Sequence, residues 1–425
     1  MQPIFQWQKH QLAYCSNLHP GSELAQVNAN IKNWFNPVMQ KRQLTNMASG
    51  LWLASPVAQS LTDNNDLLAD FNQLLNQQSV NLTSLNGFPF GNFHQKVVKQ
   101  KVYLPTWAEP ERLTYTKQLA DILASQLSKN ANVILNNQLT EIKTGAISTL
   151  PLAYAKNWTV QQHNQAIHQL IELAIFLKNL EANTQVRIQL GLEMEPDCVL
   201  ENTQQLITFF TEDLLPAAML QGLNKADILN YIGCCFDTCH QAVMHENIQQ
   251  SLANIQAAGI QICKIQISNA ISTELTSEQD VAELTALLKD EKFLHQCKLK
   301  AGEQYIALDD LTETQLLSAY QSLSASLNQA EPIICNVHYH VPIHLTALTL
   351  SNGKQINTTQ PAILACLDYL KTQTQGKPYL EIETYSWLEY LTSQDKNQTQ
   401  FDLISGLADE FNWLETELKK RQLLS

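Results

Sequence analysis

Short apolar runs alternate with longer amphipathic segments along almost the whole chain, and this alternation is what most restricts the fold. The short runs are typical of buried strands, and the segments between them repeat their apolar residues with the period of an α-helix. Parallel strands need a long crossover, usually a helix, so this order predicts a mostly parallel sheet. Candidate strands lie at residues 12–19, 50–56, 80–91, 141–151, 186–195, 231–236, 261–268, 333–340 and 378–387.

Around eight strands separated by helices predict a (β/α)8 barrel, with an open doubly wound sheet as the alternative. Such a barrel often reaches the present length of 425 residues through insertions. The alternation breaks at 273–332, where acid-rich helical patterns surround one short strand-like run. We therefore predict a single barrel domain over residues 1–425, with a helical insertion at 273–332 that precedes strand 7. The runs at 333–340 and 378–387 are then the last two strands.

Charge and apolar pattern restrict the partners. The formal net charge is −13 and the basic residues are not clustered, so a nucleic acid would be repelled and is an unexpected partner. No window has the apolar length of a membrane span and the N-terminus lacks an export pattern, so we expect a cytoplasmic protein. The nine cysteines are scattered through expected strands and helices, which favours reduced core residues over a disulfide framework.

The run at 231–236 leads directly into Asp237, and His240 follows where the chain should turn into a helix. A carboxylate and an imidazole placed in this way can face one point, and both are ligands of divalent cations. The structural alternative is that Asp237 caps the helix and His240 is packed in the core. A barrel favours the metal interpretation, because its functional groups stand at the C-terminal ends of the strands.

Other predicted strands carry pairs of polar residues near their ends. These pairs are Glu193 and Glu195, Gln266 and Ser268, His338 and His340, and Glu381 and Glu383. Alternate residues of a strand point the same way, so each pair faces either the barrel interior or the helices. Polar groups that point inward among apolar residues need a ligand, a metal or each other.

Three of these features together resemble a known superfamily. Glu195-Pro-Asp with Glu201, Asp237-Thr-Cys-His240 and the late Glu383 are similar to the xylose-isomerase-like TIM-barrel superfamily, which includes sugar epimerases and the endonuclease IV type. More narrowly, the chain resembles the EboE family of ebo-operon metabolite traffic proteins. The segments that carry this second resemblance are 86–94, 102–107, 192–197, 264–268, 338–342 and 381–387.

The superfamily resemblance implies roles for particular residues. Glu195, Asp237 and Glu383 would hold a divalent metal, Mn²⁺, Mg²⁺ or Zn²⁺, while His240 and Glu201 would contact substrate hydroxyls. Glu195 or Glu383 would move a proton. From the residues alone, Glu193 and Glu381 stay open as the true ligands, since each lies one pleat deeper than its neighbour.

The chain departs from the epimerase pattern at one ligand. Epimerases place a histidine on the strand at 261–268, where this chain has Gln266. We expect His340, or else His338, to supply the missing ligand, and Gln266 and His338 to contact substrate. The endonuclease-like pattern also uses early histidines, for which His19 and His94 stand in suitable places, so a site with several ions stays open. We also expect His94 to contact substrate.

These expectations give one leading function and two alternatives. The first is a metal-dependent isomerase or epimerase that acts on a small polyhydroxylated or carbonyl metabolite, with Glu195, Glu383 and His240 as the catalytic residues. The second is a metal-dependent phosphoester hydrolase of the endonuclease IV type. The third is a protein that binds a metabolite without reaction. The EboE resemblance implies a role in moving or processing a small metabolite.

Overall fold

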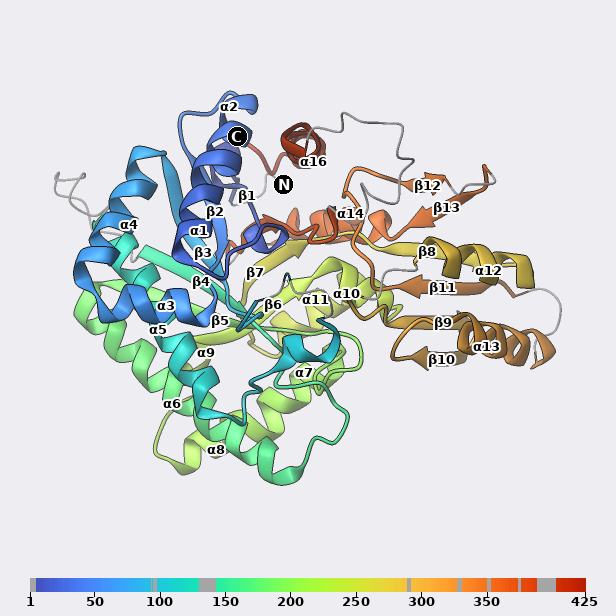
Figure 1. Ribbon diagram of the computed structural model, residues 1–425. Helices are drawn as coiled ribbons and strands as arrows, with labels where there is room; N and C mark the ends of the chain where they lie inside the picture. Colours follow the sequence, from blue (N-terminus) through green and yellow to red (C-terminus); the bar gives the residue numbers. More distant parts are fainter. Residues whose placement is uncertain are drawn as a thin grey trace.

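A computed structural model describes residues 5–92, 94, 98–129, 143–288, 292–326, 331–349, 353–373, 376–387 and 403–425. Parts of the predicted fourth strand (141–142) and of the predicted insertion (289–291 and 327–330) lie outside the described residues. Eight parallel strands with helices around them make up the larger part of the molecule (Figure 1). They are β1 (Ala13–Tyr14), β2 (Met47–Trp52), β3 (Val80–Asn86), β4 (Lys143–Thr149), β5 (Val186–Glu193), β6 (Ile232–Asp237), β7 (Ile262–Ile267) and β14 (Tyr379–Ile382).

The eight strands close into a barrel. Hydrogen-bonded neighbours follow the order β1-β14-β7-β6-β5-β4-β3-β2, and every pair in this sheet is parallel. A parallel bridge between Cys15 and Gly50 then joins the end of β1 to β2. The predicted (β/α)8 barrel is therefore confirmed, and the open doubly wound sheet is not observed.

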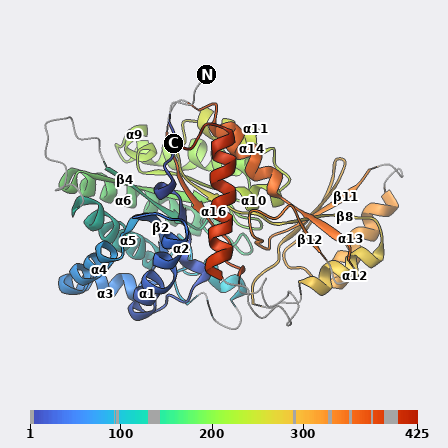
Figure 2. The ribbon, with the colours of Figure 1, turned by 90° about the horizontal axis from the view of Figure 1, so that it is seen from above.

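Helices cover the outside of the barrel in the order that the alternation predicts. They are α1 (Leu24–Asn30), α2 (Asn36–Lys41), α3 (Ser55–Asp63), α4 (Asn65–Gln77), α5 (Pro110–Lys129), α6 (Val160–Thr184), α7 (Thr203–Thr208), α8 (Leu215–Leu220), α9 (Lys225–Leu229), α10 (Thr238–Val243), α11 (Ile248–Ala257), α14 (Gln360–Leu370) and α16 (Leu403–Lys420). The last helix, α16, packs beside α2 and α14 (Figure 2). Among the helices described, none has the length and hydropathy needed to cross a membrane.

Side-chain caps start several of these helices. Asn64 accepts hydrogen bonds from the backbone N–H groups of residues 66 and 67 at the start of α4. Thr159 and Gln162 form a reciprocal capping box at the start of α6. Such caps satisfy N–H groups that have no partner within the helix, which explains why the helices begin at these polar residues.

A second sheet lies between β7 and β14 in the sequence and projects to one side of the barrel (Figure 1). Its strands run in the order β10-β9-β11-β8-β13-β12, and all their pairings are antiparallel. They are β8 (Ile271–Leu275), β9 (Cys297–Ala301), β10 (Gln304–Leu308), β11 (Ile333–Val337), β12 (Ala347–Thr349) and β13 (Gln355–Thr358). Two helices, α12 (Glu278–Leu287) and α13 (Glu313–Ser326), share a hydrophobic core with this sheet.

The insertion differs from the predicted one in content and in extent. It holds the two expected helices, but it also contains the antiparallel sheet, and it follows the seventh barrel strand, β7. The run at 333–340 is not a barrel strand, because β11 pairs with β8 and β9. An apolar strand buried on both faces has the same pattern in either kind of sheet, so the sequence does not distinguish the two. The assignment of residues 1–425 to one domain stays a prediction.

A buried ion pair fills the barrel interior below the site. Lys264 Nζ lies 2.9 Å from Glu381 Oε1, and neither side chain is exposed. Ser84 Oγ donates to the second carboxylate oxygen of Glu381 at 2.7 Å. Gly50 leaves the room for this carboxylate, since a Cβ at that position would lie 1.9 Å from Glu381 Oε2. Glu381 is therefore engaged within the barrel, and Glu383 is the acid that reaches the rim.

Candidate functional site

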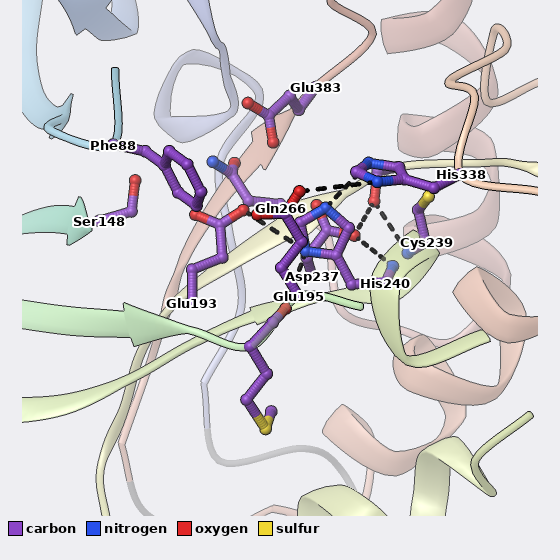
Figure 3. A network of polar contacts seen from close by, with 12 residues as sticks. Phe88, Ser148, Glu193, Glu195, Asp237, Cys239, His240, Gln266, His338 and Glu383 are labelled. Carbon is purple, nitrogen blue, oxygen red and sulfur yellow. Dashed lines mark hydrogen bonds and ion pairs between the residues drawn. The ribbon is translucent and has the colours of Figure 1, made fainter. Parts of the chain in front are cut away.

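Three buried carboxylates meet at the C-terminal ends of β5, β6 and β14, and we call them the carboxylate cluster. Glu193 ends β5, Asp237 ends β6, and Glu383 directly follows β14. One oxygen of each lies within 4.8 Å of the others, which is a spacing that a single metal ion can span. Figure 3 shows Glu193 and Glu383 on one side of the site and Asp237 next to His240. Three acids buried this closely need protons or a cation, because like charges in a low dielectric repel strongly.

Hydrogen bonds hold Asp237 and Glu383, and Glu193 and Asp237 each keep an oxygen without a partner in the described residues. Asp237 Oδ1 accepts from the His240 backbone N–H at 2.9 Å and from Ser268 Oγ at 2.6 Å. Asn17 Nδ2 donates to Glu383 Oε1 at 2.7 Å. Glu193 Oε2 and Asp237 Oδ2 are buried, and neither has a hydrogen-bond partner in the described part of the chain. Asp237 is thus the helix cap that the structural alternative predicted, and its second oxygen is still free for a ligand.

The electrostatics of the carboxylate cluster agree with this crowding. Burial, and then the neighbouring Asp237 carboxylate, raise the pKa of Glu383 to about 8. Burial, followed by repulsion from Glu383 and Asp237, raises the pKa of Glu193 well above its usual value. Without a cation, the cluster therefore retains protons at neutral pH.

Gln266 on β7 lies beside the cluster in the barrel register. It pairs with Asp237 on one side and with Glu381 on the other. Its side chain is fully buried, and neither the amide oxygen nor the amide nitrogen has a partner among the residues that the structure describes. The amide oxygen is a neutral ligand, and here it occupies the strand on which the resemblance expects a histidine.

Three histidines gather next to the carboxylate cluster. His240 lies in α10, and His338 and His340 follow β11 of the insertion. Their ring centroids are 4.6 Å (His240 to His338), 5.4 Å (His338 to His340) and 6.1 Å (His240 to His340) apart. Glu195 lies on the same side, and the Tyr103 hydroxyl group donates a hydrogen bond to Glu195 Oε1 at 2.8 Å. Three groups that include these histidines could each hold an ion: Glu195 with His240 and His338, Asp237 with His240 and His340, and Cys239 with His338 and His340.

Burial and neighbouring charges set the protonation of these groups. Burial, with repulsion from His240, lowers the pKa of His338 well below its usual value. Burial also lowers the pKa of His340 to about 4. Burial acts in the same direction on His240, but the carboxylates of Asp237 and Glu195 outweigh it and raise its pKa. Burial raises the pKa of Glu195 to about 6.

A small cavity of about 70 Å³ opens in front of these side chains. One wall is polar and contains the histidines, Glu193, Glu195 and Glu383. The other is largely apolar and comes from the loop after β3, from the turn at Lys99–Tyr103 and from the insertion. Its lining residues are Phe88, Pro89, Val98, Lys99, Val102, Tyr103, Phe293, Leu294 and Tyr385. An apolar lining with a few polar groups on one wall is typical of a small-molecule site.

The structure brings most of the predicted site residues together and separates one of them. Those that line the cavity are Glu195, His240, His338, His340 and Glu383, while Asp237 and Gln266 lie beneath them. His94 is half-buried nearby, where its Nε2 lies 2.8 Å from the Asn17 backbone oxygen. Glu201 lies in a different depression, with Tyr154 and Asp197.

Loop geometry explains the separation of Glu201. Asp197 adopts a left-handed conformation, with φ of 63°, and pairs with Lys298 of the insertion. The Glu201 carboxylate then accepts from the Asp197 backbone N–H at 3.1 Å, so it is folded back onto its own loop. The spacing of the residues in the sequence does not predict this turn, because a residue other than glycine rarely adopts a positive φ.

Among the lining residues that were missed in the sequence are two that contact His338 and Glu195. Gln296 of the insertion accepts from His338 Nδ1 at 2.9 Å and donates to Tyr103 Oη at 3.0 Å. Tyr103 lies within a segment that carried the EboE resemblance, so a signal for it existed. No signal in the sequence indicated Gln296, because it precedes a strand of the insertion whose pairing was not predicted.

Comparisons with known proteins leave the family open. No protein-family model matches the chain, and no curated protein matches it. Among solved structures, D-allulose 3-epimerase from Methylomonas sp., in complex with D-allulose, is 10% identical, with a TM-score of 0.35 over 62% of this chain and 74% of the enzyme. The IolI protein with a bound zinc atom is 14% identical, with a TM-score of 0.35 over 74% of this chain and 96% of IolI. The probable 3-DHS dehydratase AsbF from Bacillus anthracis is 11% identical, with a TM-score of 0.32 over 75% of this chain and 99% of AsbF. The barrel itself rests on the strand pairing described above.

Proposed function

We propose that the protein is a metal-dependent isomerase or epimerase that acts on a small polyhydroxylated or carbonyl metabolite. The observation that carries this proposal is the carboxylate cluster, in which Glu193 and Asp237 keep unpartnered oxygens among the described residues, at the C-terminal ends of barrel strands and next to the cavity. Catalytic groups of barrel enzymes occupy this end of the strands.

The ion would be held by Glu193, Asp237 and Glu383, with the amide oxygen of Gln266 as a further ligand. An all-oxygen set of this kind suits Mn²⁺ or Mg²⁺, and Zn²⁺ also binds carboxylates. When bound, the cation would polarise a substrate carbonyl and stabilise negative charge on the substrate oxygens. This set replaces the predicted Glu195 with Glu193, and it leaves the predicted ligand His340 outside the carboxylate cluster.

Proton transfer would fall to groups on the polar wall of the cavity. Glu195 has a pKa of about 6, so most of it is ionised at neutral pH and can accept a proton from a carbon next to a carbonyl. Tyr103 orients this carboxylate through its hydroxyl group. His240, whose pKa is raised, would supply a proton or a hydrogen bond to a substrate oxygen.

The cavity also supports the kind of substrate. Its lining, with polar side chains on one wall and apolar ones on the other, suits a small metabolite, and the net charge of −13 opposes a polyanion. A role in processing or moving such a metabolite, as the EboE resemblance implies, is part of the proposal. A cytoplasmic location is also part of the proposal, and the nine free, buried cysteines support it.

Two measurements test the proposed function. Elemental analysis of the purified protein should find a divalent metal, and incubation with ketose and aldose phosphates in deuterated water should place deuterium on a substrate carbon. Glu193→Gln should lose the Mg²⁺ or Mn²⁺ of the carboxylate cluster and the deuterium exchange, whereas Glu212→Gln, an exposed acid on the outer helices, should keep both. A metal-loaded protein that exchanges no carbon-bound hydrogen would contradict the proposal and favour binding without reaction.

A further inference from the structure

His240 and His338 present the same ring nitrogen to each other, and we call them the histidine pair. Their Nε2 atoms are 3.1 Å apart, and both rings are buried (Figure 3). Each nitrogen of an imidazole is either a donor or an acceptor, so the tautomers of the two rings decide whether their Nε2 atoms can form a hydrogen bond.

The tautomers follow from the partners of the other ring nitrogens. His240 Nδ1 lies 2.8 Å from the backbone oxygen of Met194, and His338 Nδ1 lies 2.9 Å from Gln296 Oε1. Oxygens of this kind only accept, so Nδ1 carries the hydrogen in both rings. The Gln296 amide is oriented by its nitrogen, which donates to the Pro196 backbone oxygen at 3.4 Å.

With both Nδ1 positions protonated, a neutral histidine pair places two Nε2 lone pairs face to face. Such an arrangement needs one proton or one cation between or beside the two nitrogens. Two ligands of a tetrahedral zinc ion with bonds of about 2.0–2.1 Å are about 3.3 Å apart, which is near the observed spacing. Histidines that bind metals also donate their second N–H to a carbonyl oxygen, as both rings do here.

A carboxylate and a third imidazole adjoin the histidine pair. Glu195 offers an oxygen within 4.8 Å of a nitrogen of each ring of the pair. His340 is anchored in the same manner, with Nδ1 2.8 Å from the Glu383 backbone oxygen. The His340 side chain is only 1% exposed, and its Nε2 has no hydrogen-bond partner among the described residues. By contrast, both ring nitrogens of His245 in the same half of the molecule contact protein atoms.

We propose that His240 Nε2, His338 Nε2 and the Glu195 carboxylate form a second cation site, separate from the carboxylate cluster. Imidazole ligands select borderline ions, so this site would take Zn²⁺ or Co²⁺, whereas the all-oxygen cluster accepts Mg²⁺ or Mn²⁺. Binding there does not depend on the proposed function. If that function holds, an ion on Glu195 removes the proposed base, so Zn²⁺ would inhibit an enzyme that Mg²⁺ activates.

Titration of the Mg²⁺-loaded protein with Co²⁺ tests the second site, because cobalt bound to histidine absorbs visible light. We expect one Co²⁺ per chain in the wild type and in Glu193→Gln, which lacks only a ligand of the carboxylate cluster. His338→Gln should bind Co²⁺ at least about 100-fold more weakly, and the matched control His245→Gln should bind it as the wild type does.

A supporting variant covers the case in which His338→Gln does not fold. Gln296→Leu removes only the hydrogen bond to His338 Nδ1, and loss of such a partner weakens metal binding by about 10–100-fold. Unchanged Co²⁺ affinity in His338→Gln, or in a folded Gln296→Leu, would overturn the second site and leave the proposed function intact. Loss of all cobalt binding in Glu193→Gln would show a single shared site and would also overturn it. A protein that binds neither Mg²⁺ nor Co²⁺ would overturn both proposals.

Discussion

Lys264 and Glu381 form an ion pair of 2.9 Å that is shielded from solvent on every side, directly below the candidate metal site. Burial alone would lower the pKa of Lys264, but Glu381 outweighs it and the pKa is raised. The lysine is therefore charged, and the barrel interior depends on its partner.

Removing that partner should be costly. Glu381→Ala leaves the Lys264 ammonium group buried without a counterion, which typically destabilises a protein by about 3–5 kcal/mol. Urea unfolding measures this change. The control is Glu172→Ala, which breaks a surface pair with Lys117 and should change stability by less than about 1 kcal/mol. Equal effects of the two substitutions would contradict the account of the barrel interior.

A substitution at Gly50 tests the packing around the same ion pair. A Cβ on Gly50 would lie 1.9 Å from Glu381 Oε2, so Gly50→Ala must displace the carboxylate from Lys264. We expect a loss of about 3 kcal/mol or more in the free energy of unfolding. Gly91→Ala is the matched control, because no atom of the described residues lies within 4 Å of its added Cβ. The two variants should differ clearly in thermal unfolding, and similar melting temperatures would refute the prediction.

The barrel could be predicted from the sequence because apolar residues repeat with different periods in its strands and helices. Asp237 and Glu383 could be predicted as site residues because each stands at the end of an apolar strand. Period two places Glu193 and Glu195 on the same side of a strand, but it does not say which one lies at the depth of Asp237. That choice depends on barrel register, which is a long-range property. The insertion was harder still, since its antiparallel pairings join runs that are individually indistinguishable from barrel strands.

The pKa of Glu410 predicts a pH dependence of stability. This residue of α16 is fully buried and accepts hydrogen bonds from the Ile343 backbone N–H, Thr384 and Trp387. Burial outweighs these bonds and raises the pKa from 4.5 to about 7. Between these two values, the native state keeps a proton that the unfolded state has lost, so stability falls as pH rises.

The Glu410 contribution to this fall is about 3 kcal/mol, from about 1.36 kcal/mol per unit of pKa shift. Unfolding of wild type and of Glu410→Gln between pH 4.5 and 7 measures it, with Glu212→Gln as an exposed control. The Glu410→Gln protein should lose less stability over this window than the wild type. Parallel pH profiles for the two proteins would show that Glu410 does not titrate in this range.

Metal binding should depend on pH in the opposite direction. Glu383 has a pKa of about 8, and that of Glu193 is also raised, so an incoming cation must displace protons from the carboxylate cluster. For each proton released, affinity should rise up to about tenfold per pH unit, and it should level off above pH 8. Calorimetry with Mg²⁺ or Mn²⁺ in buffers of different ionisation enthalpy gives both the affinity and the number of protons. An affinity that is constant from pH 6 to pH 8 would mean that these carboxylates are not the ligands.

Gln266→His should strengthen the candidate metal site. The wild-type amide is buried with both polar atoms unpartnered among the described residues, so it loses no hydrogen bond on replacement. It lies beside Asp237 in the barrel register, and an imidazole there would add a stronger ligand for borderline ions. We expect Zn²⁺ to bind at least about tenfold more tightly, with little change for Mg²⁺, which prefers oxygen ligands. Competition with a chromophoric chelator measures both affinities in one protein, so that the Mg²⁺ value controls for any general distortion of the barrel. Weaker binding of both ions would place the metal away from β7 and would remove Gln266 from the proposed ligand set.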